Sequence, residues 1–114
     1  VSVYPKCLLN TLLCITQGRG QETPGEDPVL NGKYAASFVS GMQGSDPKYL
    51  KVSACLKHFA AYSVETNRAG FAAVVNAQDM EDTYLPAFEA GVVQGNASGI
   101  MCRLVESVSL GVSS

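Results

Sequence analysis

The sequence has 114 residues, a formal net charge of −2 and a hydrophobic content of 46%. This length allows one small domain, and the hydrophobic content predicts a collapsed fold rather than a disordered chain. No cluster of Lys and Arg forms a basic stripe, which argues against nucleic acid and against a membrane surface as partners.

Residues 1–17 read VSVYPKCLLNTLLCITQ, in which one lysine precedes an apolar stretch. A single charged residue, the lack of a small-x-small cleavage site and the missing initiator methionine count against a signal peptide. The apolar stretch is also shorter than the ~20 residues of a membrane span. We therefore interpret residues 1–17 as a divergent flank.

Residues 18–28 read GRGQETPGEDP and predict a loop, because their glycines and prolines suit neither a packed helix nor a buried strand. A surface loop is favoured, in which Arg19 forms salt bridges with Glu22, Glu26 and Asp27. The alternative is a loop at the rim of a functional site.

A helix is expected over residues 33–42, with Asn31 as its N-cap and Gly44 beyond its end. Apolar side chains at i, i+4 spacing predict its buried stripe, which consists of Tyr34, Phe38 and Met42. A buried strand follows over residues 50–56, and Lys57 and His58 come directly after it. The polar segment 62–70 then predicts a second loop.

A second helix is predicted to begin at Asn76 or Asp79 and to run to about residue 93, with Pro86 kinking or restarting it. Its expected buried stripe is Leu85, Phe88 and Val92. Residues 97–102 predict another buried strand. This alternation of helices and strands is typical of a parallel sheet with crossover helices, in which ligands meet the carboxyl ends of the strands.

Lys57 and His58 are the most specific local candidates for a site, since two polar residues end an apolar strand there. Taken alone, such a pair is more often a strand end that reaches water. His58 is the only histidine, which excludes a site built on two histidines. We expect no cofactor and no metal.

The cysteines give no further chemistry. They are Cys7, Cys14, Cys55 and Cys102, and no two of them form a C-x-x-C zinc or redox pair. Buried free thiols are favoured over a disulfide between the first two.

Five segments, in this order and at these separations, resemble one known family. They read GRGQETPGEDP, NGKYAASFVSGMQG, LKVSACLKHFAAYS, QDMEDTYLPAFEAGV and GIMC. Together they are similar to the N-terminal barrel domain of glycoside hydrolase family 3, especially its β-xylosidase and β-glucosidase branch. The resemblance covers residues 18–102 and implies an α/β fold, a partial TIM (β/α)8 barrel of roughly two β/α units. Residues 103–114 are then a divergent tail.

The resemblance implies sugar-binding roles for four residues. The family's G-R-x-x-E loop supplies an arginine to a hydroxyl of the sugar in the −1 subsite, which maps onto Arg19, with Glu22 as a supporting neighbour. The family's Lys-His pair holds hydroxyls of the same sugar and maps onto Lys57 and His58. Charged donors beside a carboxylate suit neutral sugar hydroxyls.

The implied activity is retaining hydrolysis of terminal β-linked glucosyl or xylosyl residues. The implied partners are a β-glycoside or oligosaccharide substrate, the missing remainder of the barrel and a second domain. No residue here matches the family's aspartate nucleophile or its acid/base, and we expect the isolated chain to be inactive. The alternatives are a non-catalytic carbohydrate-binding remnant and an α/β domain without a ligand.

Both ends of the resemblance depart from the family pattern. Leu104 stands where members carry a tyrosine of the −1 subsite, and residues 14–17 replace a D-P-R-W-like segment. The resemblance also implies an extracellular or secretory location. Asn96-Ala97-Ser98 is a sequon for N-glycosylation at Asn96 and is compatible with that location.

Overall fold

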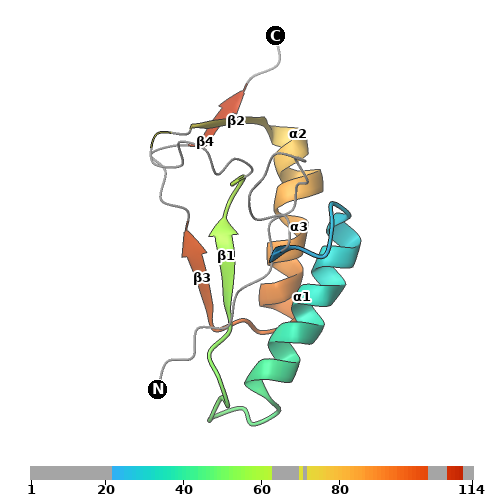
Figure 1. Cartoon of the computed structure of the whole chain (residues 1–114), viewed down its shortest axis with the longest axis vertical. Helices are drawn as coiled ribbons and strands as arrows, with labels where there is room; N and C mark the ends of the chain where they lie inside the picture. The colour runs from blue at the N-terminus through green and yellow to red at the C-terminus, as the bar shows by residue number, and fades with distance from the viewer. Residues whose placement is uncertain (1–21, 63–69, 71, 103–107, 112–114) are drawn as a thin grey trace.

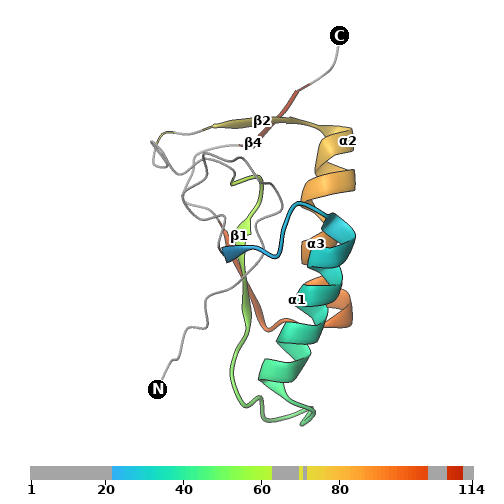
Figure 2. The same ribbon diagram turned by 45° about the vertical axis from the view of Figure 1, so that its right-hand side comes forward.

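The computed structural model of the chain describes residues 22–62, 70, 72–102 and 108–111, the last four through their backbone alone. Two helical segments lie next to each other on one side of the parallel strands β1 and β3 (Figure 1). The same separation of helices from strands is visible after a 45° turn (Figure 2). The predicted α/β architecture is confirmed.

The first helix, α1 (Pro28–Gln43), begins three residues before the predicted N-cap. Asp27 is the actual N-cap, because its Oδ1 accepts hydrogen bonds from the backbone N–H groups of Val29 (2.8 Å) and Leu30 (3.1 Å). A proline in the first helical turn needs no N–H partner there. The prediction that Asn31 caps this helix was therefore wrong, and Asn31 lies buried inside the helix.

The buried face of α1 also differs from the predicted stripe. Tyr34 and Phe38 are exposed and stack on each other with ring centroids 5.6 Å apart. The buried face carries smaller or polar side chains and consists of Asn31, Gly32, Ala35, Val39 and Gln43. Small residues on this face allow the second helical segment to approach α1 closely. At the C-terminus Gly44 has φ 76°, which confirms it as the residue that ends the helix.

Strand β1 (Cys55–Phe59) pairs in parallel with β3 (Gly99–Cys102). The strand predicted over 50–56 is thus displaced toward the C-terminus, and residues 50–54 precede it. The predicted strand over 97–102 is confirmed for its last four residues. The register shifts between Lys57 and Phe59, which marks a local irregularity in the carboxyl half of β1.

The second helical segment follows Asn76, which is its N-cap and accepts a hydrogen bond from the Asp79 N–H at 2.7 Å. The segment comprises α2 (Ala77–Asp79), a π-helical turn at Met80–Tyr84, α3 (Pro86–Glu89) and a second π-helical turn at Ala90–Gln94.

Pro86 restarts the helix as α3, as predicted, and the wider π turn before it accommodates the missing N–H. Of the predicted buried stripe, Phe88 is buried, Leu85 is half-buried and Val92 is exposed. The second helix therefore begins where the sequence predicted, but only one stripe residue is fully buried.

A second pair of parallel strands was not predicted. Strand β2 (Ala73–Asn76) leads into α2 and pairs with β4 (Val108–Gly111), which lies in the segment interpreted above as a tail. This pair lies beyond the carboxyl ends of β1 and β3 in Figure 1.

The hydrophobic core lies between α1, α3 and β1. It consists of Ala35, Val39, Ala54, Leu56, Ala87 and Phe88. A smaller cluster of Ala61, Ala73 and Val75 packs near β2. Several apolar residues of the strands remain exposed, among them Val74, Ile100 and Met101.

The amide of Gln43 joins the helix layer to the start of both central strands. Its Nε2 donates to the carbonyl of Asn96 (2.7 Å), and its Oε1 accepts from the N–H groups of Ser98 (2.9 Å) and Ala54 (3.3 Å). Gln43 is itself buried. One side chain thus satisfies three backbone groups at the amino ends of β1 and β3.

Candidate sugar-binding site

Lys57 and His58 lie within β1 rather than in a loop after it, which corrects the predicted placement. Leu56 is buried in the core against the helices. Because successive side chains of a strand point to opposite faces, Lys57 points away from the helix-covered face. Lys57 is the central residue of this five-residue strand, and His58 follows it toward the carboxyl end, where ligands bind parallel sheets.

Glu22 and Lys57 form an ion pair across 35 residues of sequence. The Lys57 Nζ lies 3.2 Å from Oε2 of Glu22, and the two side chains are 17% and 22% exposed. Figure 1 shows the segment that contains Glu22 crossing from the start of α1 toward β1. The structure thus brings together two of the four predicted sugar-binding residues.

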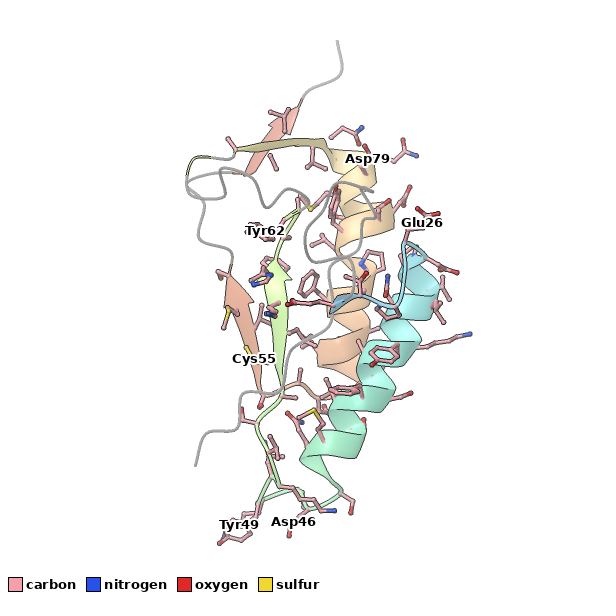
Figure 3. All side chains as sticks on the ribbon, in the orientation of Figure 1. Glu26, Asp46, Tyr49, Cys55, Tyr62 and Asp79 are labelled. Carbon is pink, nitrogen blue, oxygen red and sulfur yellow. The ribbon has the colours of Figure 1, made fainter. Side chains whose placement is uncertain are left out.

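His58 lies against an aromatic residue that the sequence did not single out. The rings of His58 and Tyr62 are 5.0 Å apart and tilted by 51°, and Tyr62 is buried. Figure 3 shows Tyr62 just beyond the end of β1. The next strand residue, Phe59, meets the edge of Phe88 from α3 with ring centroids 5.1 Å apart. The end of β1 is therefore packed through aromatic contacts.

The remaining charged candidates divide between capping and exposed positions. Asp27 caps α1, and Glu26 is exposed near the start of that helix (Figure 3). Arg19 lies outside the described residues, as does Leu104. The predicted role of Arg19 therefore stays a prediction.

The opposite end of the strands carries a different charged turn. Oδ1 of Asp46 accepts hydrogen bonds from the N–H groups of Tyr49 and Lys48, and these bonds lower the pKa of the Asp46 carboxyl below its usual value. Figure 3 shows Asp46 and Tyr49 at the amino end of β1, far along the molecule from Tyr62. Asp46 is a turn residue and lies outside the candidate sugar-binding site.

In the part of the chain that the structure describes, no group of three or more His, Cys, Asp or Glu side chains could hold a metal ion. Cys55 and Cys102 are free thiols, whereas Cys7 and Cys14 lie outside the described residues. Among the described helices, none is long and apolar enough to span a membrane.

The arrangement at the end of β1 suits a polyhydroxylated, uncharged ligand. An ammonium group has three donors, so Lys57 can bind Glu22 and still offer donors to hydroxyl groups. The carboxylate of Glu22 accepts one N–H group of the ammonium, and this contact limits the directions in which the other two N–H groups can point. Among the described residues, Lys57 and Glu22 thus supply paired binding groups for such a ligand.

Comparison with known families decides the assignment. The model of the glycosyl hydrolase family 3 N-terminal domain matches residues 14–110. The chain belongs to glycoside hydrolase family 3. Asp79 and Asp82, at the start of the second helical segment, are not assigned as its nucleophile, since Asp79 takes part in the cap with Asn76.

Relatives in this family include plant and fungal enzymes. The chain is 52% identical over 92 residues to β-D-xylosidase 3 of Arabidopsis thaliana, an alignment that covers 75% of this chain and 12% of the relative. It is 46% identical over 89 residues to the exo-1,4-β-xylosidase bxlB of Emericella nidulans, with the same two coverages. The chain thus spans about an eighth of the length of these relatives.

Solved structures of the family share the fold of this segment. The GH3 exo-β-xylosidase XlnD, in complex with a xylobiose aziridine probe, superposes with a TM-score of 0.83 at 34% identity, covering 92% of this chain and 14% of XlnD. β-Glucosidase 3B from Thermotoga neapolitana, in complex with glucose, gives 0.81 at 31% identity over 94% of this chain and 14% of that enzyme. The chain is therefore a partial α/β fragment of the family's N-terminal TIM-barrel domain.

Proposed function

We propose that this segment supplies the sugar-binding part of a retaining β-glycosidase that removes terminal β-linked xylosyl or glucosyl residues. The observation that carries the proposal is the ion pair between Glu22 and Lys57, the central residue of β1. In this proposal Lys57 and His58 bind hydroxyls of the sugar in the −1 subsite, and Arg19 binds the same sugar. Glu22 holds the Lys57 ammonium group in place.

Xylosides are the first substrates to test. The chain is 52% identical to a β-D-xylosidase of Arabidopsis thaliana and 46% identical to a fungal exo-1,4-β-xylosidase. These values support a xylosyl unit over a glucosyl unit in the −1 subsite.

The proposal is tested in a chimera, in which residues 18–102 replace the matching segment of A. thaliana β-D-xylosidase 3. The chimera, here named the xylosidase chimera, has a complete barrel around this segment. We expect it to hydrolyse an aryl β-xyloside with kcat/KM within about tenfold of the parent enzyme, because the substituted segment supplies equivalent binding groups. A folded chimera without turnover would contradict the proposal.

The isolated chain is expected to be inactive. No residue in it maps onto the family's nucleophile or acid/base, and retaining hydrolysis requires both. Residues 1–114 should therefore not hydrolyse aryl β-xylosides or β-glucosides above a heat-treated control. Saturable turnover by the purified chain would overturn this expectation.

The non-catalytic remnant is separated from a domain without a ligand by NMR titration of the chain with xylose and glucose. Shifts confined to residues around Lys57 and His58 indicate binding without chemistry. Unchanged spectra at millimolar sugar indicate a domain without this ligand.

The exposed strand residues support a partner within the same protein. Val74 is 73% exposed, and Ile100 and Met101 of β3 are also exposed. Open strand edges and apolar side chains of a partial sheet require covering elements. The remainder of the barrel is the proposed cover, and the proposed second domain supplies further substrate contacts.

An extracellular or secretory location remains part of the proposal, and Asn96 gives a test of it. Asn96 is exposed and follows the end of the second helical segment, so an oligosaccharide would extend into solvent. Expressed through a eukaryotic secretory pathway, the chain is expected to carry an N-glycan that endoglycosidase treatment removes. Asn96→Gln and Ser98→Ala should each abolish the mass difference. An unmodified secreted chain would rule out this site.

A further inference from the structure

The loop that carries Glu22 is anchored to α1 by one buried side chain. Asn31 has an exposed fraction of 0%, and its Nδ2 donates to the carbonyl of Gly25 at 2.8 Å. Its backbone N–H donates to the carbonyl of Asp27 at 2.9 Å. The backbone bond is the first i→i−4 bond of the helix, whereas the side-chain bond ties the loop to α1 at Gly25.

This anchor lies close to the ion pair in the sequence. Gly25 follows Glu22 by three residues, and the Glu22 carboxylate lies 3.2 Å from Lys57 Nζ. The hydrogen bonds of Asp27 to Val29 and Leu30 fix the helix start, but these residues all follow Gly25 in the sequence and are therefore farther along the chain from Glu22. The Asn31–Gly25 bond is thus the nearest described side-chain anchor of α1 to Glu22.

Stability alone gives a poor reason for an asparagine at this position. Oδ1 of Asn31 is buried, and the structure shows no hydrogen-bond partner for it. A buried acceptor without a partner loses its hydration without compensation, and asparagine is also a weak helix former. The donor group is the part of the side chain with a satisfied contact, and that contact is to the loop.

We propose that Asn31 is a positioning residue for the sugar-binding site. By holding Gly25, it keeps the Glu22 carboxylate against Lys57, so that the Lys57 ammonium group has a fixed orientation toward the sugar. This inference rests on the proposed function of Lys57. It predicts that Asn31 acts through Glu22 and contributes nothing further once the Glu22 carboxylate is removed.

A double-mutant cycle in the xylosidase chimera tests this coupling. We expect Glu22→Gln to lower kcat/KM about 30-fold and Asn31→Ala about 10-fold. The loss for Asn31→Ala is smaller because that variant displaces the Glu22 carboxylate, whereas Glu22→Gln removes its charge. The double variant should lose about 30-fold, the same as Glu22→Gln alone. Most of each loss should appear in kcat, because the Lys57 contact strengthens in the transition state.

Gln43→Ala is the matched control, since Gln43 is the other buried amide of α1 and contacts the opposite end of β1. It should destabilise the chimera while leaving kcat and KM per folded molecule unchanged. If Asn31→Ala does not fold, Asn31→Ser replaces it in the same cycle, because serine fits the space but does not reach Gly25 as the longer amide does.

The possible outcomes separate this inference from the proposed function. A loss in the double variant of about 300-fold, the product of the single losses, would show independent action and overturn the role of Asn31. An Asn31 variant with unchanged kcat would overturn it as well. If Lys57→Ala itself retained full activity, the proposed function would fail.

Discussion

Lys57→Ala in the xylosidase chimera is expected to lower kcat/KM by about 10²-fold or more, because a charged hydrogen bond that strengthens in the transition state contributes roughly 2–4 kcal/mol there. The ring of the −1 sugar flattens toward an oxocarbenium ion during the reaction, so contacts to its hydroxyls affect the rate as well as binding. The assay compares wild-type and variant chimeras on one aryl β-xyloside at equal folded concentration.

Asp82→Asn is the matched control for this variant. Asp82 is an exposed acid in the first turns of the second helical segment, where removing the charge should change stability by a few tenths of a kcal/mol and leave turnover nearly intact. If folded Lys57→Ala kept the kcat/KM of the wild-type chimera, Lys57 would be a solvated strand residue. The sugar-binding assignment would then fail.

Gln43→Ala is expected to reduce the free energy of unfolding of the 114-residue chain by about 3 kcal/mol, because it leaves buried backbone groups without partners. The groups concerned are the N–H of Ala54, the N–H of Ser98 and the carbonyl of Asn96. Because the total stability of a small domain is only roughly 5–15 kcal/mol, a loss of this size should clearly lower the urea midpoint of the variant. Urea denaturation followed by circular dichroism measures the difference.

Gln78→Ala provides the comparison, since Gln78 is an exposed glutamine in α2. Its removal should change the free energy of unfolding by less than about 0.5 kcal/mol. Equal urea midpoints for the Gln43 and Gln78 variants would show that the Gln43 hydrogen bonds contribute little net stability.

The sequence predicted both helical segments and the strands β1 and β3, but it missed β2 and β4 and misjudged where the first helix begins. Asp27 followed by proline is itself a strong start signal, with a capping carboxylate before a residue that needs no N–H partner. Asn31 also fits a capping pattern, and the local sequence does not show that its side chain is buried. That burial depends on tertiary contacts, among them the hydrogen bond to the Gly25 carbonyl of the neighbouring loop.

The buried face of α1 was misjudged for a related reason. Hydrophobic periodicity selects the largest apolar side chains, here Tyr34 and Phe38, whereas close packing between helices selects small ones. Ala35 and Val39 face the second helical segment and β1, and Gln43 is buried because its polar atoms all have partners. Which face meets a neighbour depends on tertiary contacts that local spacing does not encode.

The sequence supplied candidate residues for the site but not their contacts. Lys57 and His58 were assigned to a strand end because polar residues usually mark one, yet in this partial barrel they lie inside the strand. The pairing of Glu22 with Lys57 joins two distant segments, and only the fold brings them together. Tyr62 had no distinguishing sequence signal, since its role depends on the position of the His58 ring.

A crystal structure of the xylosidase chimera with xylose bound tests the sugar-binding assignment most directly. We expect Lys57 Nζ to contact both Glu22 and a hydroxyl of the sugar, with His58 and Arg19 binding the same sugar ring. A xylose held in the barrel with Lys57 contacting only Glu22 or solvent would contradict the assignment.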